Sequence, residues 1–103
     1  MPYILRLIQQ YHPSFAHKFM ELESRFQELE RDTPSLPKGK RYQPLSGSEP
    51  TNTLIWECEF SSLAEVQSAI DDMAAHPGHF VLFEEQLPYI SKTVTEIYKV
   101  LDL

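Results

Sequence analysis

The chain has 103 residues, of which 42% are hydrophobic and 23% are charged, and its net charge is −6. This composition suits one globular domain over residues 1–103 and argues against disorder. The basic residues cluster only at Lys38-Gly39-Lys40-Arg41, so the charge disfavours nucleic acid and anionic membranes as partners. The N-terminal apolar run is short and is broken by Arg6. It is shorter than a signal peptide or a membrane span requires, and we therefore expect a cytoplasmic protein.

The first third of the chain predicts a strand followed by a long helix. Residues 3–10 are apolar on both faces except at Arg6, which is typical of a central strand that is covered on both sides. Pro13 fits the first turn of a helix, which we expect over residues 13–32 because two prolines follow that range. The apolar side chains of this helix recur at spacings of three and four and form one stripe: Phe15, Phe19, Leu22, Phe26 and Leu29.

The middle of the chain predicts a hairpin. Residues 39–46 read as a weak edge strand, because Pro44 cannot donate a ladder hydrogen bond, and turn residues follow at positions 46–52. Residues 51–60, TNTLIWECEF, then alternate strictly between two faces. One face carries Asn52, Leu54, Trp56, Cys58 and Phe60, and the other carries Thr53, Ile55, Glu57 and Glu59. The first is the expected core face, where Cys58 would be a buried and inert thiol.

The last third predicts two helices and a final strand. Ser62 and Glu65 have the spacing of a capping box, which marks the start of a helix. His76-Pro77-Gly78 interrupts this helix, so we expect two helical segments that meet at an angle. Residues 93–103 read as the last strand, but their alternation does not decide which face lies in the core.

The predicted order of elements is strand, helix, strand, strand, helix, strand. This is the βαββαβ plan of a ferredoxin-like α+β fold. Right-handed crossovers give a four-stranded antiparallel sheet, with the first and third strands in the middle and both helices on one face. The opposite face would expose Ile4, Ile8 and Ile55 in a monomer, so we expect two sheets to pack face to face in a homodimer.

The histidines predict no metal site. His76 and His79 have an H-x-x-H spacing, but the helix break between them removes a shared helix face, and no carboxylate or cysteine is placed to complete a zinc site. His12 and His17 are expected at the surface. The three glycines are isolated, so a glycine-rich phosphate loop is absent from the sequence, and no cofactor is expected.

The strand order, the short extra helix before the last strand and two stretches of sequence resemble the dimeric α/β-barrel superfamily. The stretches are RYQPLSGSEPTNTLIWECEFSSLAEV, residues 41–66, and TEIYKVLD, residues 95–102. Within the superfamily, the chain is most similar to the NIPSNAP-like branch of small, largely uncharacterised proteins. The resemblance implies a homodimer whose two sheets form a barrel with a cavity in each half.

The resemblance leaves two classes of function open. Members of the superfamily include cofactor-free monooxygenases acting on quinols, haem-degrading enzymes, polyketide cyclases and stress-response proteins. The helix histidine, asparagine and tryptophan of the haem-degrading members do not map onto this chain, because Trp56 lies on a strand and Asn52 lies beside a turn. The first hypothesis is a protein that binds a small apolar or aromatic molecule in the cavity, as a cofactor-free, monooxygenase-like enzyme or as a binder. The alternative is a non-catalytic dimeric module for protein interaction or stress response.

The residues expected to line the cavity are Arg6, Glu57, Glu59, Tyr42 and His79. Arg6 shares a strand face with both carboxylates by parity, so it should pair with one of them. The pair either forms a structural network or orients a polar ligand, and the sequence leaves both readings open. Tyr42 would supply a hydroxyl group, and His79 would act at the rim as a base or a ligand.

Overall fold

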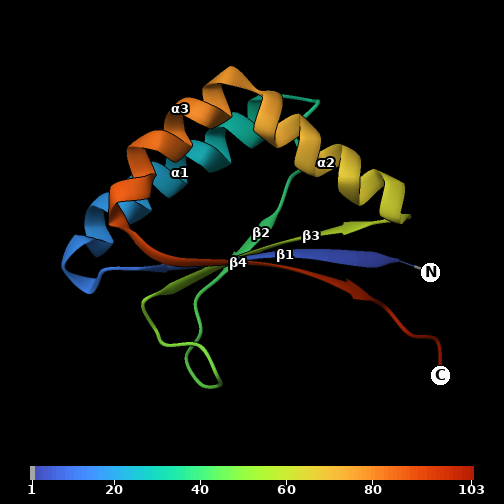
Figure 1. The fold of residues 1–103 in the computed structure, drawn as a ribbon, viewed down its shortest axis with the longest axis horizontal. Helices are drawn as coiled ribbons and strands as arrows, with labels where there is room; N and C mark the ends of the chain where they lie inside the picture. Colours follow the sequence, from blue (N-terminus) through green and yellow to red (C-terminus); the bar gives the residue numbers. More distant parts are fainter. Residues whose placement is uncertain (1) are drawn as a thin grey trace.

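The computed structural model describes residues 2–103 and confirms the predicted ferredoxin-like plan (Figure 1). The elements, in order, are β1 (Tyr3–Tyr11), η1 (Pro13–Phe15), α1 (Ala16–Asp32), β2 (Lys40–Tyr42), β3 (Thr53–Phe60), α2 (Leu63–Ala75), α3 (Pro77–Gln86), η2 (Leu87–Tyr89) and β4 (Ile90–Lys99).

The four strands form one antiparallel sheet in the order β2-β3-β1-β4. The first and third strands therefore occupy the middle, as predicted. Arg6 on β1 lies opposite Glu57 on β3 and Glu96 on β4. This register settles the face that the sequence left open: Glu96 points away from the helices with Arg6, and Ile97 shares the helix side with Leu5.

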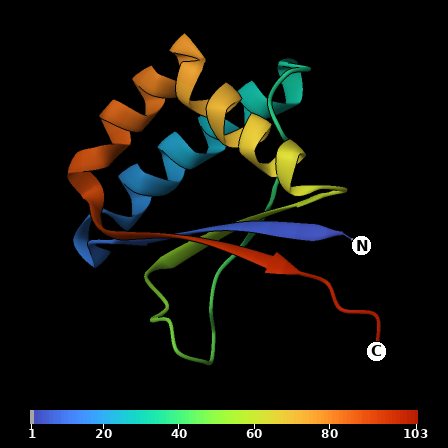
Figure 2. The same ribbon diagram turned by 45° about the vertical axis from the view of Figure 1, so that its right-hand side comes forward.

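All three α-helices cover the same face of the sheet (Figures 1 and 2). The apolar stripe of α1 is buried at Phe19, Leu22 and Phe26, as predicted. Phe15 is the exception: its exposed fraction is 47%, because it lies in the 3₁₀ turn before α1 begins. The largest core cluster lies between the sheet and α2 and consists of Leu5, Leu36, Trp56, Val66 and Met73.

The strands differ in length from the prediction. β2 ends at Tyr42 instead of position 46, because the chain leaves the sheet before Pro44, which has no N–H group to donate. β3 begins at Thr53 instead of position 51. β4 spans Ile90–Lys99 instead of 93–103. Its pairing with β1 begins at Ile90, which lies opposite Tyr11 next to a register shift, and ends at Lys99, which lies opposite Tyr3 at the start of β1.

The predicted helix break is confirmed. α2 ends at Ala75 and α3 begins at Pro77, with His76 between them in an extended conformation. The Nδ1 atom of His76 accepts a hydrogen bond of 3.3 Å from the backbone N–H of His79. His76 is therefore the N-cap of α3. At the start of α2, Ser62 Oγ accepts the N–H of Glu65 at 3.1 Å, as the capping-box spacing predicted.

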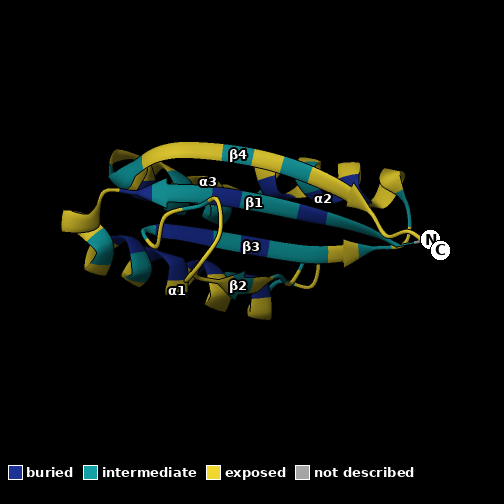
Figure 3. Cartoon of the chain, turned by 90° about the horizontal axis from the view of Figure 1, so that it is seen from below, coloured by how far each residue is buried: buried dark blue, intermediate teal, exposed yellow. Residues whose placement is uncertain are grey.

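The face of the sheet away from the helices, the outer face, has no helical cover (Figure 3). The β2–β3 loop, residues 43–52, extends from this side of the sheet (Figure 1). Its Pro44 and Gly47 line the same hollow as Ile8 and Ile55. Ile8 is consequently only 7% exposed, whereas the strand residues around Arg6 stay partly open to solvent.

Candidate ligand-binding site

A buried group of charged side chains lies between α1 and the sheet. Arg41 Nε donates to Glu23 Oε2 at 2.6 Å, and Arg41 Nη1 donates to Glu30 Oε1 at 3.2 Å. Arg41 Nη2 also donates to Glu30 Oε2. The side chains of Arg41, Glu23 and Glu30 are 13%, 8% and 9% exposed, so the group is largely removed from water.

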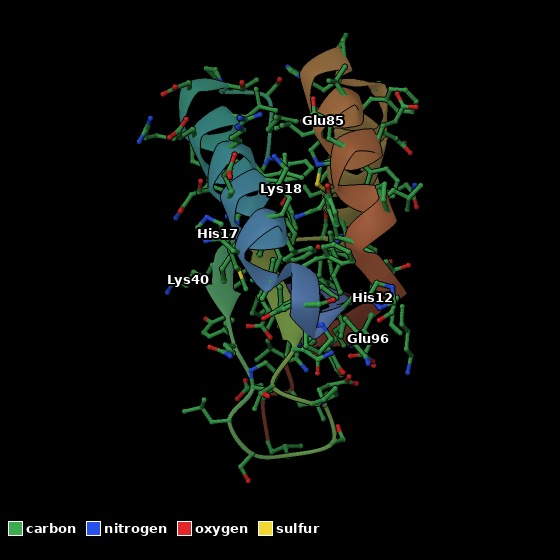
Figure 4. The ribbon with its side chains drawn as sticks, turned by 90° about the vertical axis from the view of Figure 1, so that its left-hand side faces the viewer. His12, His17, Lys18, Lys40, Glu85 and Glu96 are labelled. Carbon is green, nitrogen blue, oxygen red and sulfur yellow. The ribbon has the colours of Figure 1, made fainter. Side chains whose placement is uncertain are left out.

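The periodicities of β2 and α1 explain why these three side chains meet between the helix and the sheet. Arg41 lies opposite Trp56 on β3, so it points to the helix side of the sheet, whereas Lys40 on the adjacent position projects from the edge of β2 (Figure 4). Glu23 and Glu30 are seven residues apart, which puts both on one face of α1. Trp56 Nε1 and the backbone N–H of Gly39 each donate to Glu30 Oε1 at 3.2 Å and complete its hydrogen bonding.

Gly39 allows this arrangement because it approaches the Trp56 ring closely. A Cβ atom at position 39 would lie 2.0 Å from Trp56 Nε1. We therefore expect Gly39→Ala to displace the indole and lower the free energy of unfolding by about 1–3 kcal/mol, measured by urea denaturation. Ser48→Ala in the exposed β2–β3 loop is the control and should leave the urea midpoint unchanged. Equal stability of Gly39→Ala and the parent protein would contradict the close approach.

A half-open pocket of about 130 Å³, which we call the internal pocket, adjoins the charged group. Its lining is Leu7, Gln9, Glu23, Phe26, Glu30, Arg41, Trp56, Met73, His79, Phe83 and Gln86. A wider hollow of about 400 Å³, the vestibule, lies beside it and is almost entirely apolar. The vestibule is lined by Leu7, Ile70, Met73, Ala74, His79, Phe80, Phe83 and Thr95, and it shares four of these residues with the internal pocket. A mostly apolar lining with a few placed polar side chains is the usual composition of a small-molecule site.

Gln86, the last residue of α3, is fully buried in the lining of the internal pocket. Its Nε2 atom donates to Glu23 Oε1 at 3.0 Å and to the backbone oxygen of Phe19 at 3.3 Å. Both partners are acceptors, so they fix the orientation of the amide. Within residues 2–103, Gln86 Oε1 has no hydrogen-bond donor. A buried acceptor without a donor is costly, and a bound molecule that donates a hydrogen bond would satisfy it.

His79 lies where the internal pocket and the vestibule meet. Its ring packs edge-on against Phe26, with centroids 4.9 Å apart. Burial lowers the pKa of His79 from its ordinary value of 6.5, so the imidazole is neutral near pH 7 and is able to accept a proton.

The outer face carries the predicted pairing. Arg6 Nε donates to Glu57 Oε1 at 2.6 Å, which confirms that these side chains share a face and pair within one sheet. Arg6 also lies over the ring of Tyr98, 4.7 Å from its centroid, and Tyr98 donates to Glu96 at 2.5 Å. The side chains of Arg6 and Glu57 are 33% and 22% exposed, so the pair is only partly removed from water.

The five residues that the sequence proposed for one cavity do not lie together in the structure. Tyr42, Glu57 and Glu59 line a shallow hollow of about 180 Å³ on the outer face, together with Lys38 and Lys40. Arg6 lines the neighbouring hollow under the β2–β3 loop. His79 lies on the other side of the sheet and joins none of them. A ligand-binding role for each of these residues stays a prediction.

Sequence reasoning missed Glu23, Glu30, Arg41 and Gln86. A signal for the two carboxylates was present, because Glu23 and Glu30 follow Phe19 and Phe26 by four residues and therefore lie on the buried side of the helix. Gln86 had no comparable signal, since it is the only buried residue of α3.

The described residues also bear on two other kinds of site. Within residues 2–103, no three His, Cys, Asp or Glu side chains are grouped as a metal ion would need. None of the helices in this part of the chain has the length and apolar character to cross a membrane.

Comparisons with known proteins establish the fold. No protein-family model matches the sequence, and no curated protein matches it either. Among solved structures, the chain is similar to a NIPSNAP family protein from Agrobacterium tumefaciens, with a TM-score of 0.80 at 14% identity, over 99% of this chain and 95% of that one. It is also similar to a dimeric ferredoxin-like protein of unknown function from Jannaschia, with a TM-score of 0.69 at 15% identity, over 97% and 100% of the chains.

A third similar structure is a candidate antibiotic biosynthesis monooxygenase from Nitrosomonas europaea. The TM-score is 0.71 at 13% identity, and the match covers 97% of this chain and 90% of that one. These neighbours confirm the fold that the resemblance implied. Because the same fold carries unrelated activities, the similarity does not by itself assign a function.

Proposed function

We propose that the protein binds a small organic molecule in the internal pocket and the vestibule, as a homodimer of the α/β-barrel type. The unpartnered Oε1 atom of Gln86 is the observation that supports binding most directly, because it is a buried acceptor of a residue that lines the hollow. The apolar vestibule would hold the body of the ligand, and the polar side chains of the internal pocket would hold its hydrogen-bonding end. A cytoplasmic location stays a prediction.

Binding can be tested with N-phenyl-1-naphthylamine, a neutral dye that fluoresces in apolar sites. Ala74 is an exposed residue of α2 on the vestibule wall, so Ala74→Trp should fill the vestibule without disturbing the core. We expect this variant to bind the dye at least about tenfold more weakly than the parent protein. Ala64→Trp, at an exposed position of the same helix outside the vestibule lining, is the matched control and should bind normally. Absence of dye binding to the parent protein, or equal binding by both variants, would contradict the site.

The outer face supports the homodimer. The helices cover one side of the sheet, and the β2–β3 loop covers only part of the other (Figures 1 and 3). Packing a second sheet on the outer face would bury Ile4 and Ile55 and would remove the Arg6–Glu57 pair further from water. The similar ferredoxin-like protein from Jannaschia is dimeric, which supports a homodimer here.

Cofactor-free oxygenation is a second candidate function. It is favoured by His79, a neutral imidazole beside the pocket that is able to take a proton from a bound hydroxyarene. The similarity to the Nitrosomonas protein is consistent with this chemistry. Oxygen uptake in the presence of a hydroxynaphthalene, lost in Ala74→Trp and kept in Ala64→Trp, would be its signature.

A further inference from the structure

The internal pocket has more buried negative charge than positive charge. Glu23 and Glu30 face a single guanidinium, that of Arg41, which is the only cationic side chain in the lining. His79 does not compensate, because burial lowers its pKa and keeps the ring neutral near pH 7. One carboxylate charge is therefore left without a cation in a site that is largely removed from water, which is an unfavourable arrangement for an empty pocket.

The guanidinium and indole donors of the pocket are already engaged. Arg41 directs Nε, Nη1 and Nη2 at the two carboxylates, and Trp56 Nε1 donates to Glu30. Glu30 accepts four hydrogen bonds, two of them from Arg41. Glu23 accepts only two, and Gln86 Oε1 accepts none. Acceptor capacity is thus left on Glu23 and Gln86, two side chains that contact each other at 3.0 Å.

We infer that the molecule bound in the internal pocket carries a protonated amine at its buried end. This inference rests on the proposed binding function of the same pocket. An ammonium group would donate to Gln86 Oε1 and to Glu23, and it would balance the excess negative charge. The aromatic and thioether side chains of Phe80, Phe83 and Met73 suit an aromatic or alkyl body behind that group.

The test compares three ligands of nearly the same shape: 2-(2-naphthyl)ethylamine, 2-(2-naphthyl)ethanol and 2-naphthylacetate. Their affinities are measured by displacement of N-phenyl-1-naphthylamine and by calorimetry at pH 7. We expect the amine to bind about tenfold or more tightly than the alcohol, and the carboxylate to bind most weakly. Glu23→Gln removes the excess charge while keeping the shape, so it should abolish the preference for the amine over the alcohol. Glu28→Gln, an exposed change on the same helix, should preserve that preference.

The outcomes separate this inference from the proposed function. If the alcohol or the carboxylate binds as tightly as the amine, the ammonium assignment is wrong and the binding site stands. The same holds if the dye binds and none of the three ligands displaces it. If neither the dye nor any ligand binds, the proposed function fails and the inference fails with it. A preference for the amine that survives in Glu23→Gln also overturns the assignment, because the charge would then lie elsewhere.

Discussion

Replacing Arg41 by methionine should destabilise the protein by about 3–5 kcal/mol, because the change leaves two buried carboxylates without a cation. Methionine keeps most of the length of the side chain, so the loss would come from the charge and the hydrogen bonds more than from a cavity. Urea denaturation monitored by Trp56 fluorescence measures the effect directly, since the indole donates to the same Glu30.

A second substitution identifies the cause of this loss. If stranded carboxylates are responsible, adding Glu30→Gln to Arg41→Met should recover part of the lost stability, because one buried charge is removed. Arg31→Met is the matched control: Arg31 pairs with Asp32 at 3.2 Å, but its side chain is 70% exposed, so the urea midpoint should not change. A double variant that is less stable than Arg41→Met alone would show that the carboxylates are not the source of the loss.

The alternation of apolar and polar residues along the strands predicted most of the fold. The ten residues 51–60 contain two carboxylates on one parity and Trp56 on the other. Together with the parity of the first strand, this pattern placed Arg6 on the face of both carboxylates, and the structure shows that Glu57 is the partner. The prediction succeeded because side chains alternate between the two faces along each strand, which can be read directly from the sequence. A register slip of one residue would move every side chain to the opposite face, so the apolar pattern specifies the register. The end of β2 was predicted less well, since Pro44 showed that the strand is weak without showing where it stops.

The internal pocket could not be predicted in the same way. It needs Arg41 from an edge strand, two carboxylates from α1 and Gln86 from α3, which are brought together by the packing of the helical layer on the sheet. Helix periodicity places Glu23 and Glu30 on the buried side of α1, but it does not identify the cation that they meet. His79 was assigned to the rim of a cavity from its position in the sequence, and that argument could not show on which side of the sheet the histidine would lie.

A substitution on the outer face should have the second large effect, which is on the assembly of the dimer. Sedimentation equilibrium at micromolar concentration should give twice the chain mass for the parent protein, because a second sheet is the simplest cover for this face. Ile55→Glu should shift the protein to a monomer, with dimer affinity reduced by about a hundredfold or more. The two-fold axis would place two added carboxylates in the interface, next to the existing Glu57 residues, and a buried unpaired charge costs several kcal/mol.

Leu63→Glu supplies the matched control for this change. Leu63 is 54% exposed at the start of α2, on the helix side of the sheet, so it adds the same charge at a surface that the proposed dimer leaves free. This variant should sediment as the parent protein does. Circular dichroism must show that Ile55→Glu remains folded, since Ile55 is half-buried within the monomer as well. A folded parent protein that sediments as a monomer would refute the sheet-to-sheet dimer. Loss of the dimer in both variants would place the interface on the helices instead, because only an interface on that side is sensitive to Leu63.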